Sequence, residues 1–154
     1  MTDGHGQGHG GPDAAFDTGA TGSCGAGTAM TTAAIEIRRD PSKGRGVFAR
    51  RAIAAGELIE AAPVVVFDAE EARHLDRTIL HHYYFHWDGD PDADGRSAVA
   101  FGTLSVCNHS SSPRARVERN YAGQTLDLHA VRPIAPGEEV TIDYGCPLWF
   151  EVSE

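Results

Sequence analysis

Apolar and polar residues alternate in short runs through most of the chain, and this alternation predicts a domain built mainly from β-strands. Ile35 and Ile37 alternate with charged residues, as in a half-buried strand. Similar runs recur downstream, bounded by Gly, Pro, Asn or Asp. We expect further strands at 45–49, 58–60, 64–67, 83–87, 98–101, 115–120, 126–131 and 140–142. Pro63 would separate the strand at 58–60 from the strand at 64–67.

One segment has a helical pattern instead. Asp68 is a suitable N-cap, and Glu70 and Glu71 would lie in the first helical turn. Ala72, Leu75 and Ile79 recur at helical spacing. The pattern predicts one surface helix from residue 69 to about residue 82.

The same pattern divides the chain into three parts. Residues 1–33 are rich in Gly, Ala, Thr, Asp and His, with Phe16 as their only aromatic residue. Such a segment buries too little apolar surface to offset its ordering entropy, so we expect a disordered leader. Met30 precedes the first patterned segment, and we hypothesise that translation starts there. A domain at 34–150 and a short tail at 151–154 complete the division.

Charge and composition limit the kinds of partner that the chain is expected to bind. The chain has 13 Lys and Arg against 22 Asp and Glu, a net charge of −9, which disfavours nucleic-acid binding and favours a basic protein or peptide. It has no apolar run long enough to span a membrane and no signal peptide pattern, and its 3 Cys include no CxxC pair. We therefore expect a cytoplasmic protein without membrane contact, disulfide framework or zinc cage.

Three separated segments carry the strongest functional signal: residues 43–49 (KGRGVFA), 108–110 (NHS) and 137–145 (GEEVTIDYG). Alone, each is an ordinary turn motif. In this order and spacing, with 51–57 and 130–134 beside them, they resemble the SET-domain protein lysine methyltransferases. The resemblance covers about residues 35–150 and is closest to compact stand-alone forms of the bacterial or viral type.

The resemblance implies a fold, a cofactor and a reaction. The fold would be mainly β and β-clip-like, with several small curved sheets, one surface helix and a C-terminal segment threaded beneath a loop. The cofactor would be S-adenosylmethionine, and a lysine of a basic protein would receive its methyl group. Without an accessory domain to complete a substrate groove, a chain of this size is also a candidate for homodimer formation.

The resemblance also implies the site residues. Tyr144 matches the family's catalytic tyrosine. Lys43, Gly44 and Arg45 match a turn whose uncrowded main chain holds the methionine part of the cofactor, with Gly46 keeping the exit of the turn tight. The positions expected to bind the cofactor are Lys43, Gly44, Arg45, Gly46, Tyr83, Asn108, His109, Tyr144 and Trp149.

Three positions depart from the family pattern. Ile142 stands where relatives often have Tyr or Phe, two residues before the catalytic tyrosine, so the number of methyl groups added is left open. After Asn108-His109-Ser110 the family commonly continues with Cys, Pro and Asn, whereas this chain reads Ser111-Ser112-Pro113-Arg114 and keeps only the proline. Cys146 alone cannot build the three-cysteine zinc module that some relatives carry.

The sequence gives weaker support to three other kinds of chemistry, which are calcium binding, zinc binding and thiol catalysis. Residues 90–95 copy half of a calcium loop, but Phe101 occupies the position that needs an acidic residue. His82 and His86 could contribute to a zinc site, although no HExxH or CxxC motif supports one. Cys107 could be a nucleophile, but a buried structural role fits it better. The alternatives to an enzyme are an inactive SET-like module that binds peptide or cofactor, and a metal-binding β domain; we predict no metal site.

Overall fold

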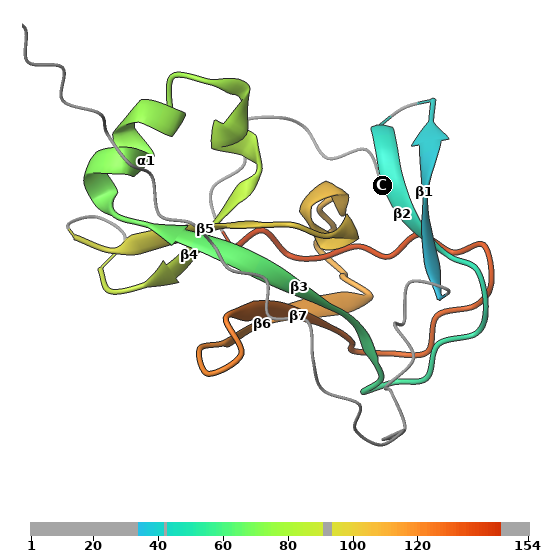
Figure 1. Ribbon diagram of the computed structural model, residues 1–154. Helices are drawn as coiled ribbons and strands as arrows, with labels where there is room; N and C mark the ends of the chain where they lie inside the picture. Colours follow the sequence, from blue (N-terminus) through green and yellow to red (C-terminus); the bar gives the residue numbers. More distant parts are fainter. Residues whose placement is uncertain (1–33, 42, 91–93, 146–154) are drawn as a thin grey trace, which may run out of the picture.

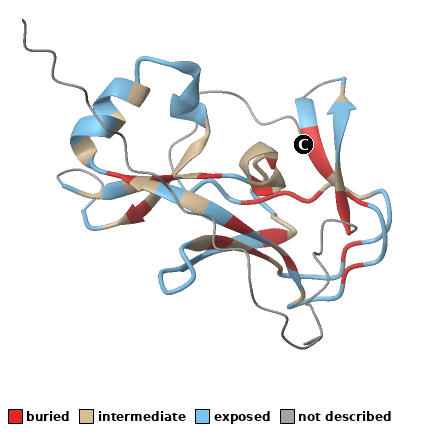
Figure 2. Ribbon diagram, viewed as in Figure 1, coloured by how far each residue is buried: buried red, intermediate tan, exposed pale blue. Residues whose placement is uncertain are grey.

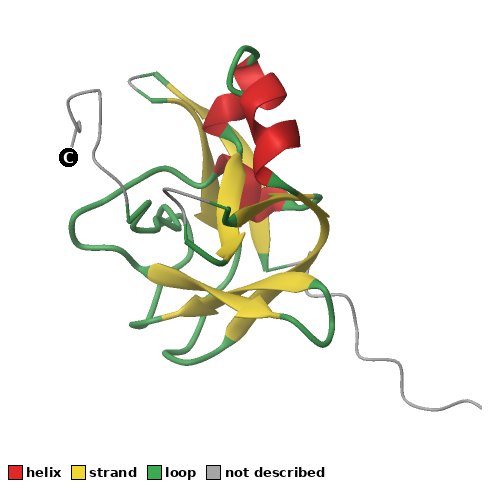
Figure 3. Ribbon diagram, turned by 90° about the vertical axis from the view of Figure 1, so that its left-hand side faces the viewer, coloured by secondary structure: helices red, strands yellow, loops and turns green. Residues whose placement is uncertain are grey.

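The computed structural model describes residues 34–41, 43–90 and 94–145, which form two antiparallel sheets (Figure 1). Strands β1 (Ile35–Asp40) and β2 (Gly44–Ala49) make a two-stranded sheet. The second sheet has the order β4-β5-β3-β7-β6 and consists of β3 (Leu58–Phe67), β4 (Tyr84–Asp88), β5 (Arg96–Ala100), β6 (Ala115–Asn120) and β7 (Thr125–Ala130). The mainly β architecture is thus confirmed, and Figure 3 shows more strand, in yellow, than helix, in red. The leader and the tail lie outside the described residues, so the domain division stays a prediction.

The two strands predicted at 58–60 and 64–67 form one continuous strand, so the prediction of a break at Pro63 is wrong. β3 changes partner there, because residues 58–63 pair with β7 and residues 64–67 pair with β5. A proline has no amide hydrogen to donate, so it disturbs a ladder least where one ladder ends and the next begins. Its carbonyl oxygen accepts a hydrogen bond from the main-chain nitrogen of Phe101 (2.8 Å).

The helical region is shorter than the pattern predicts. Helix α1 (Ala69–Leu75) begins as expected, because Asp68 accepts hydrogen bonds from the main-chain nitrogens of Glu70 and Glu71 and forms a capping box with Glu71. A separate 3-10 helix, η2 (Ile79–His82), follows. Neither buries a side chain (Figure 2), so apolar packing does not support one long helix, and the single helix over 69–82 is wrong. No helix in the described ranges is long and apolar enough to cross a membrane.

The core draws apolar side chains from both sheets, from the 3-10 helix η3 (Thr103–Val106) and from the C-terminal part of the described chain. Val140 and Ile142 are 0% and 1% exposed. Burying one side chain of this size stabilises a fold by about 1.5–3 kcal/mol. The two residues therefore anchor the segment that leads to Tyr144.

That segment lies between β2 and residues 108–110 and runs across the middle of the molecule, in red in Figure 1. The main-chain nitrogen of Val140 donates to Val47 O (2.7 Å), and that of Ile142 donates to Asn108 O (3.0 Å). The regular strand predicted at 140–142 is wrong, because the segment forms isolated bridges with a different neighbour on each side. A position between two earlier parts of the chain is the one that a threaded C-terminal segment requires.

Candidate active site

The turn between β1 and β2 is the first part of the candidate site. Gly44 has φ +82°, a left-handed conformation that favours glycine, and a Cβ at this position would meet nothing within 4 Å. The turn is fixed from below by Asp40, whose Oδ1 accepts a hydrogen bond from the main-chain nitrogen of Lys43 (2.8 Å). The main chain at Gly44 is thus held in place and left uncovered, in keeping with the predicted ligand-binding turn.

Gly46 is required for a different reason from the one expected. A Cβ on Gly46 would lie 2.6 Å from Glu139 Oε1, closer than real Cβ atoms approach a neighbour, and 3.0 Å from Asn108 Nδ2, which is unusually close. The missing side chain therefore makes room for two polar side chains from distant parts of the sequence. Its role is to let Asn108 and Glu139 lie against the turn.

Asn108 links the turn to the C-terminal segment. Its Nδ2 donates to Arg45 O (2.9 Å) and to Glu139 Oε1 (2.7 Å). The other carboxylate oxygen of Glu139 lies 3.2 Å from Lys43 Nζ, and both side chains of this ion pair are largely shielded from solvent. The sequence analysis missed Glu139 as a site residue, although it belongs to the GEE motif and is bridged to Phe48 in β2.

His109 and Tyr144 form a second contact beside this network. The main-chain nitrogen of Tyr144 donates to His109 Nδ1 (3.2 Å), and the ring centroids are 5.3 Å apart. Since Nδ1 accepts this bond, the proton of the neutral ring lies on Nε2. The Tyr144 hydroxyl donates to Cys107 O (2.9 Å), although 41% of the residue is exposed. His109 of the predicted pair therefore contacts the predicted tyrosine through both the tyrosine main chain and the two rings.

Tyr83 completes the group on the side of η2. Arg45 Nη2 donates to the Tyr83 hydroxyl at 3.5 Å, which places this tyrosine next to the glycine turn. The structure thus connects Lys43, Gly44, Arg45, Gly46, Tyr83, Asn108, His109 and Tyr144 through direct contacts or chain adjacency. Trp149 lies outside the described residues, and its expected contact with the cofactor stays a prediction.

The competing chemistries find little support nearby. Cys107 is buried, and burial, with Glu60 and Glu139 adding to it, raises the pKa of its thiol well above the usual range. A thiolate nucleophile at Cys107 is therefore disfavoured. Within the described ranges no three His, Cys, Asp or Glu residues are grouped to hold a metal ion. Residues 91–93 of the calcium-like loop lie outside those ranges.

Ile142, the departure next to the catalytic position, is a core residue. Its side chain is 1% exposed, and its main chain bonds to Asn108 O and to the nitrogen of Ser110 (both 3.0 Å). The residue therefore fixes the neighbourhood of His109 by packing and pairing.

Comparison with known proteins agrees with this geometry. The model of the SET domain family matches residues 44–145. A histone-lysine N-methyltransferase of Schizosaccharomyces pombe, specific for H3 lysine-37, is 36% identical over 118 residues, which cover 76% of this chain and 77% of that protein. An H3 lysine-4 specific enzyme of Cryptococcus neoformans is 30% identical over 122 residues, 74% of this chain but 8% of that much longer protein.

A solved structure shows the same fold. The Neurospora SET domain protein DIM-5, a histone lysine methyltransferase, superposes with a TM-score of 0.59 at 20% identity, covering 79% of this chain and 56% of that one. At this identity the likeness bears on the fold alone. Together with the family match over residues 44–145 and the fission yeast relative, it leads to one conclusion: the chain belongs to the SET domain family.

Proposed function

We propose that the chain is a protein-lysine N-methyltransferase that uses S-adenosylmethionine and acts on a basic protein, with histones as the first candidates. The observation that carries this proposal is the convergence of the 43–46 turn, the Asn108–His109 pair and Tyr144 in a member of the SET family. Relatives of the chain are named histone-lysine N-methyltransferases, which supports the same reaction and substrate class.

The residues around the glycine turn fit the expected cofactor. The main chain at Gly44 is uncovered, and Asn108 and Tyr83 place polar groups beside it. When bound, S-adenosylmethionine supplies a methyl group already activated by its sulfonium. The protein then has to bind, orient and shield the reactants, and needs no metal or acyl chemistry of its own.

Tyr144 would orient the reacting groups. Its hydroxyl hydrogen is used in the bond to Cys107 O, so toward any other neighbour the oxygen acts as an acceptor. An acceptor fixed at this position can align the hydrogens of a polarised methyl group and of a lysine amine. A free lysine has a pKa of about 10.4, so the substrate must lose its proton before it attacks. Tyr144 need not take that proton, because water can.

The charge of the chain suits a basic substrate. Its net charge of −9 attracts Lys-rich and Arg-rich proteins. The named relatives act on different lysines of histone H3, so the target lysine is not fixed by kinship. The expected homodimer and the expected cytoplasmic location stay predictions.

The test is transfer of labelled methyl groups. The purified chain is incubated with methyl-labelled S-adenosylmethionine in three separate reactions, which contain core histones, histone H3 peptides or a Lys-free basic peptide. We expect label on histone lysines, located by mass spectrometry, and none on the Lys-free peptide. The Tyr144→Phe variant is run in parallel and should transfer far less label.

Two outcomes would contradict the proposal. Label that is undiminished in the Tyr144→Phe variant would exclude the role given to Tyr144. Binding of S-adenosylhomocysteine without methylation of any basic protein would favour the inactive module, the alternative suggested by the altered sequence at Ser111 and Ser112.

A further inference from the structure

Glu139 holds two partners with its two carboxylate oxygens. Oε1 accepts from Asn108 Nδ2 at 2.7 Å, and Oε2 lies 3.2 Å from Lys43 Nζ. Its side chain is only 15% exposed. Both partners belong to the candidate cofactor site, and they come from opposite ends of the domain. A single carboxylate therefore joins the glycine turn to the Asn-His pair.

The contacts of Asn108 fix which way its amide faces. Its Nδ2 approaches two acceptors, Arg45 O at 2.9 Å and the Glu139 carboxylate. An amide oxygen facing either acceptor would be repelled, so only the NH2 group can occupy this side. Both of its hydrogens are then used inside the protein. The Oδ1 atom is directed elsewhere, and it is the atom that Asn108 can offer to a ligand.

Glu139 also balances a charge. The Lys43 ammonium would otherwise be a partly buried cation beside the turn, because no other carboxylate of the described residues lies within ion-pair distance of it. A lone cation there would repel a ligand that carries an ammonium and a sulfonium group. The carboxylate removes that repulsion while it orients Asn108.

From these contacts we propose that Glu139 is a positioning residue of the cofactor site. It orients the Asn108 amide so that Oδ1 accepts a hydrogen bond from the amino group of the cofactor, and it neutralises Lys43. The inference rests on the proposed methyltransferase function for the identity of the ligand. The orientation of Asn108 itself does not depend on that function.

The neighbouring Glu138 offers a matched control. It has the same side chain one residue away, but it accepts from the main-chain nitrogen of Ala135 (2.7 Å) and pairs with Arg114 (3.2 Å). None of these contacts reaches the 43–46 turn or Asn108. A general effect of losing a carboxylate in this segment would appear in Glu138→Gln as well.

The first experiment uses the ligand-free chain. Asn108 and Asn120 are its only asparagines, so the side-chain amide signals of a nitrogen-15-labelled sample are few, and Asn108→Ala identifies the one sought. We expect the amide hydrogens of Asn108 to exchange with water at least about tenfold faster in Glu139→Gln than in the wild type, and unchanged in Glu138→Gln. An Asn108 amide signal insensitive to Glu139→Gln would overturn the orienting role, whatever the chain binds.

The second experiment measures S-adenosylhomocysteine affinity by calorimetry. We expect Glu139→Gln to weaken binding about tenfold, with the unfolding midpoint nearly unchanged, and Glu138→Gln to bind as the wild type does. In an Asn108→Ala background, Glu139→Gln should weaken binding much less, because the two residues act in series. Equal, additive losses in both backgrounds would overturn the proposal. A wild type that binds no S-adenosylhomocysteine would instead count against the proposed function.

Discussion

The hydroxyl of Tyr144 donates a hydrogen bond to the main-chain oxygen of Cys107 at 2.9 Å, and its main-chain nitrogen donates to His109 Nδ1 at 3.2 Å. Two bonds from one residue thus hold the C-terminal segment against both neighbours of Asn108. The phenol is fixed in orientation while the residue keeps 41% of its surface exposed. A fixed polar group with an accessible face is what an orienting catalytic residue needs.

The first prediction concerns this hydroxyl. Tyr144→Phe keeps the ring and the main-chain bond to His109 but loses the fixed oxygen. We expect turnover to fall by about 10²-fold or more, as when one preorganised polar group is removed from other active sites, with S-adenosylhomocysteine affinity changed less than about threefold. Steady-state kinetics and calorimetry measure the two effects. A variant that lost affinity while its turnover at saturating cofactor stayed unchanged would indicate that Tyr144 serves binding alone.

The crowding around Gly46 gives a prediction about the effect of adding a side chain there. In Gly46→Ala the new Cβ would lie 2.6 Å from Glu139 Oε1 and 3.0 Å from Asn108 Nδ2, so both side chains must move. We expect cofactor affinity to fall at least about tenfold and stability by about 1–3 kcal/mol, the usual cost of overpacking. Gly123→Ala is a control far from the site, where the contact is with the exposed Asn120 side chain. Unchanged affinity in Gly46→Ala would show that the Asn108–Glu139 contact is dispensable.

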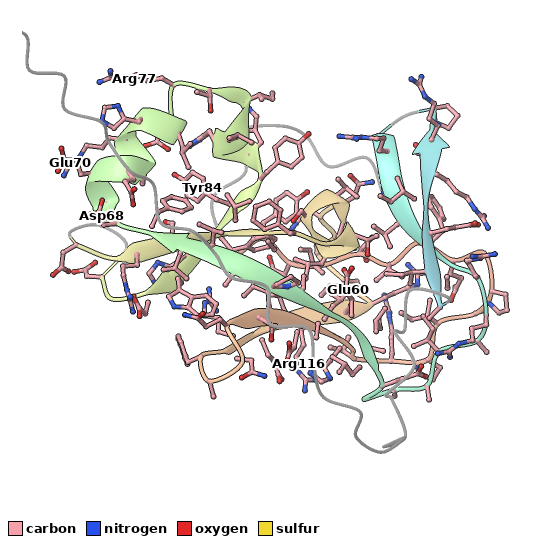
Figure 4. All side chains as sticks on the ribbon, in the orientation of Figure 1. Glu60, Asp68, Glu70, Arg77, Tyr84 and Arg116 are labelled. Carbon is pink, nitrogen blue, oxygen red and sulfur yellow. The ribbon has the colours of Figure 1, made fainter. Side chains whose placement is uncertain are left out.

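Glu60 gives a prediction about stability. Its carboxylate accepts three hydrogen bonds, from the nitrogen and the hydroxyl of Thr103 (2.9 and 2.7 Å) and from the nitrogen of Leu104 (2.7 Å). Glu60 is half-buried and lies near the middle of the view in Figure 4, whereas Arg116, the ion-pair partner of Glu118, is exposed and lies near the lower edge. We expect Glu60→Ala to lower the free energy of unfolding by about 2–3 kcal/mol. The exposed control Glu118→Gln should leave the unfolding midpoint nearly unchanged.

Urea unfolding measures both variants. Because Glu60 holds the start of η3, which leads directly into Cys107 and Asn108, its loss should also weaken cofactor binding. A Glu60→Ala variant as stable as the wild type would contradict the assigned role of its three hydrogen bonds.

The Asp76–Tyr84 pair gives a prediction about pH. Hydrogen bonds from Tyr84 (2.6 Å) and His81 (2.9 Å) lower the pKa of the Asp76 carboxyl, while burial, followed by the bond to Asp76, raises the pKa of Tyr84 to about 12. A lowered carboxyl pKa stabilises the fold above the unfolded value of about 3.9, and this contribution is lost as the pH falls. A raised phenol pKa stabilises it below about 10, and that contribution is lost as the pH rises toward 12.

Asp76→Ala should therefore be less stable than the wild type at neutral pH, by no more than about 1 kcal/mol because the pair is largely exposed. The difference should shrink below about pH 4 and above about pH 10. Urea unfolding across this range measures it, with Tyr84→Phe as the matched variant. A stability difference that is constant from acid to alkaline pH would show that the ionisation of Asp76 and Tyr84 does not contribute to the stability of the fold.

Much of the fold follows from local patterns in the sequence. The strand at 115–120 and the cap at Asp68 were predictable, because alternation and capping chemistry act over a few neighbouring residues. The length of the helix was not, since it depends on whether Ile79 finds an apolar surface, and Ile79 is 69% exposed. Pro63 was misjudged because the change of strand partner at this residue is a property of the whole sheet.

The candidate site, too, has residues that the sequence could predict and one that it could not. Tyr144 and the Asn108–His109 pair stand in motifs with a definite order along the chain, so the resemblance located them. Glu139 escaped attention because its significance lies in contacts with Lys43 and Asn108, 96 and 31 residues away in sequence. A turn motif such as Pro-Gly-Glu-Glu does not indicate which of its two glutamates faces inward.

The most direct measurement is a crystal structure of the chain with S-adenosylhomocysteine. The ligand should lie against the 43–46 turn, with its amino group within hydrogen-bond distance of Asn108 Oδ1 and its sulfur on the side of the Tyr144 hydroxyl. A ligand bound elsewhere, or a Tyr144 hydroxyl directed away from the sulfur, would contradict the assignment of this site to methyl transfer.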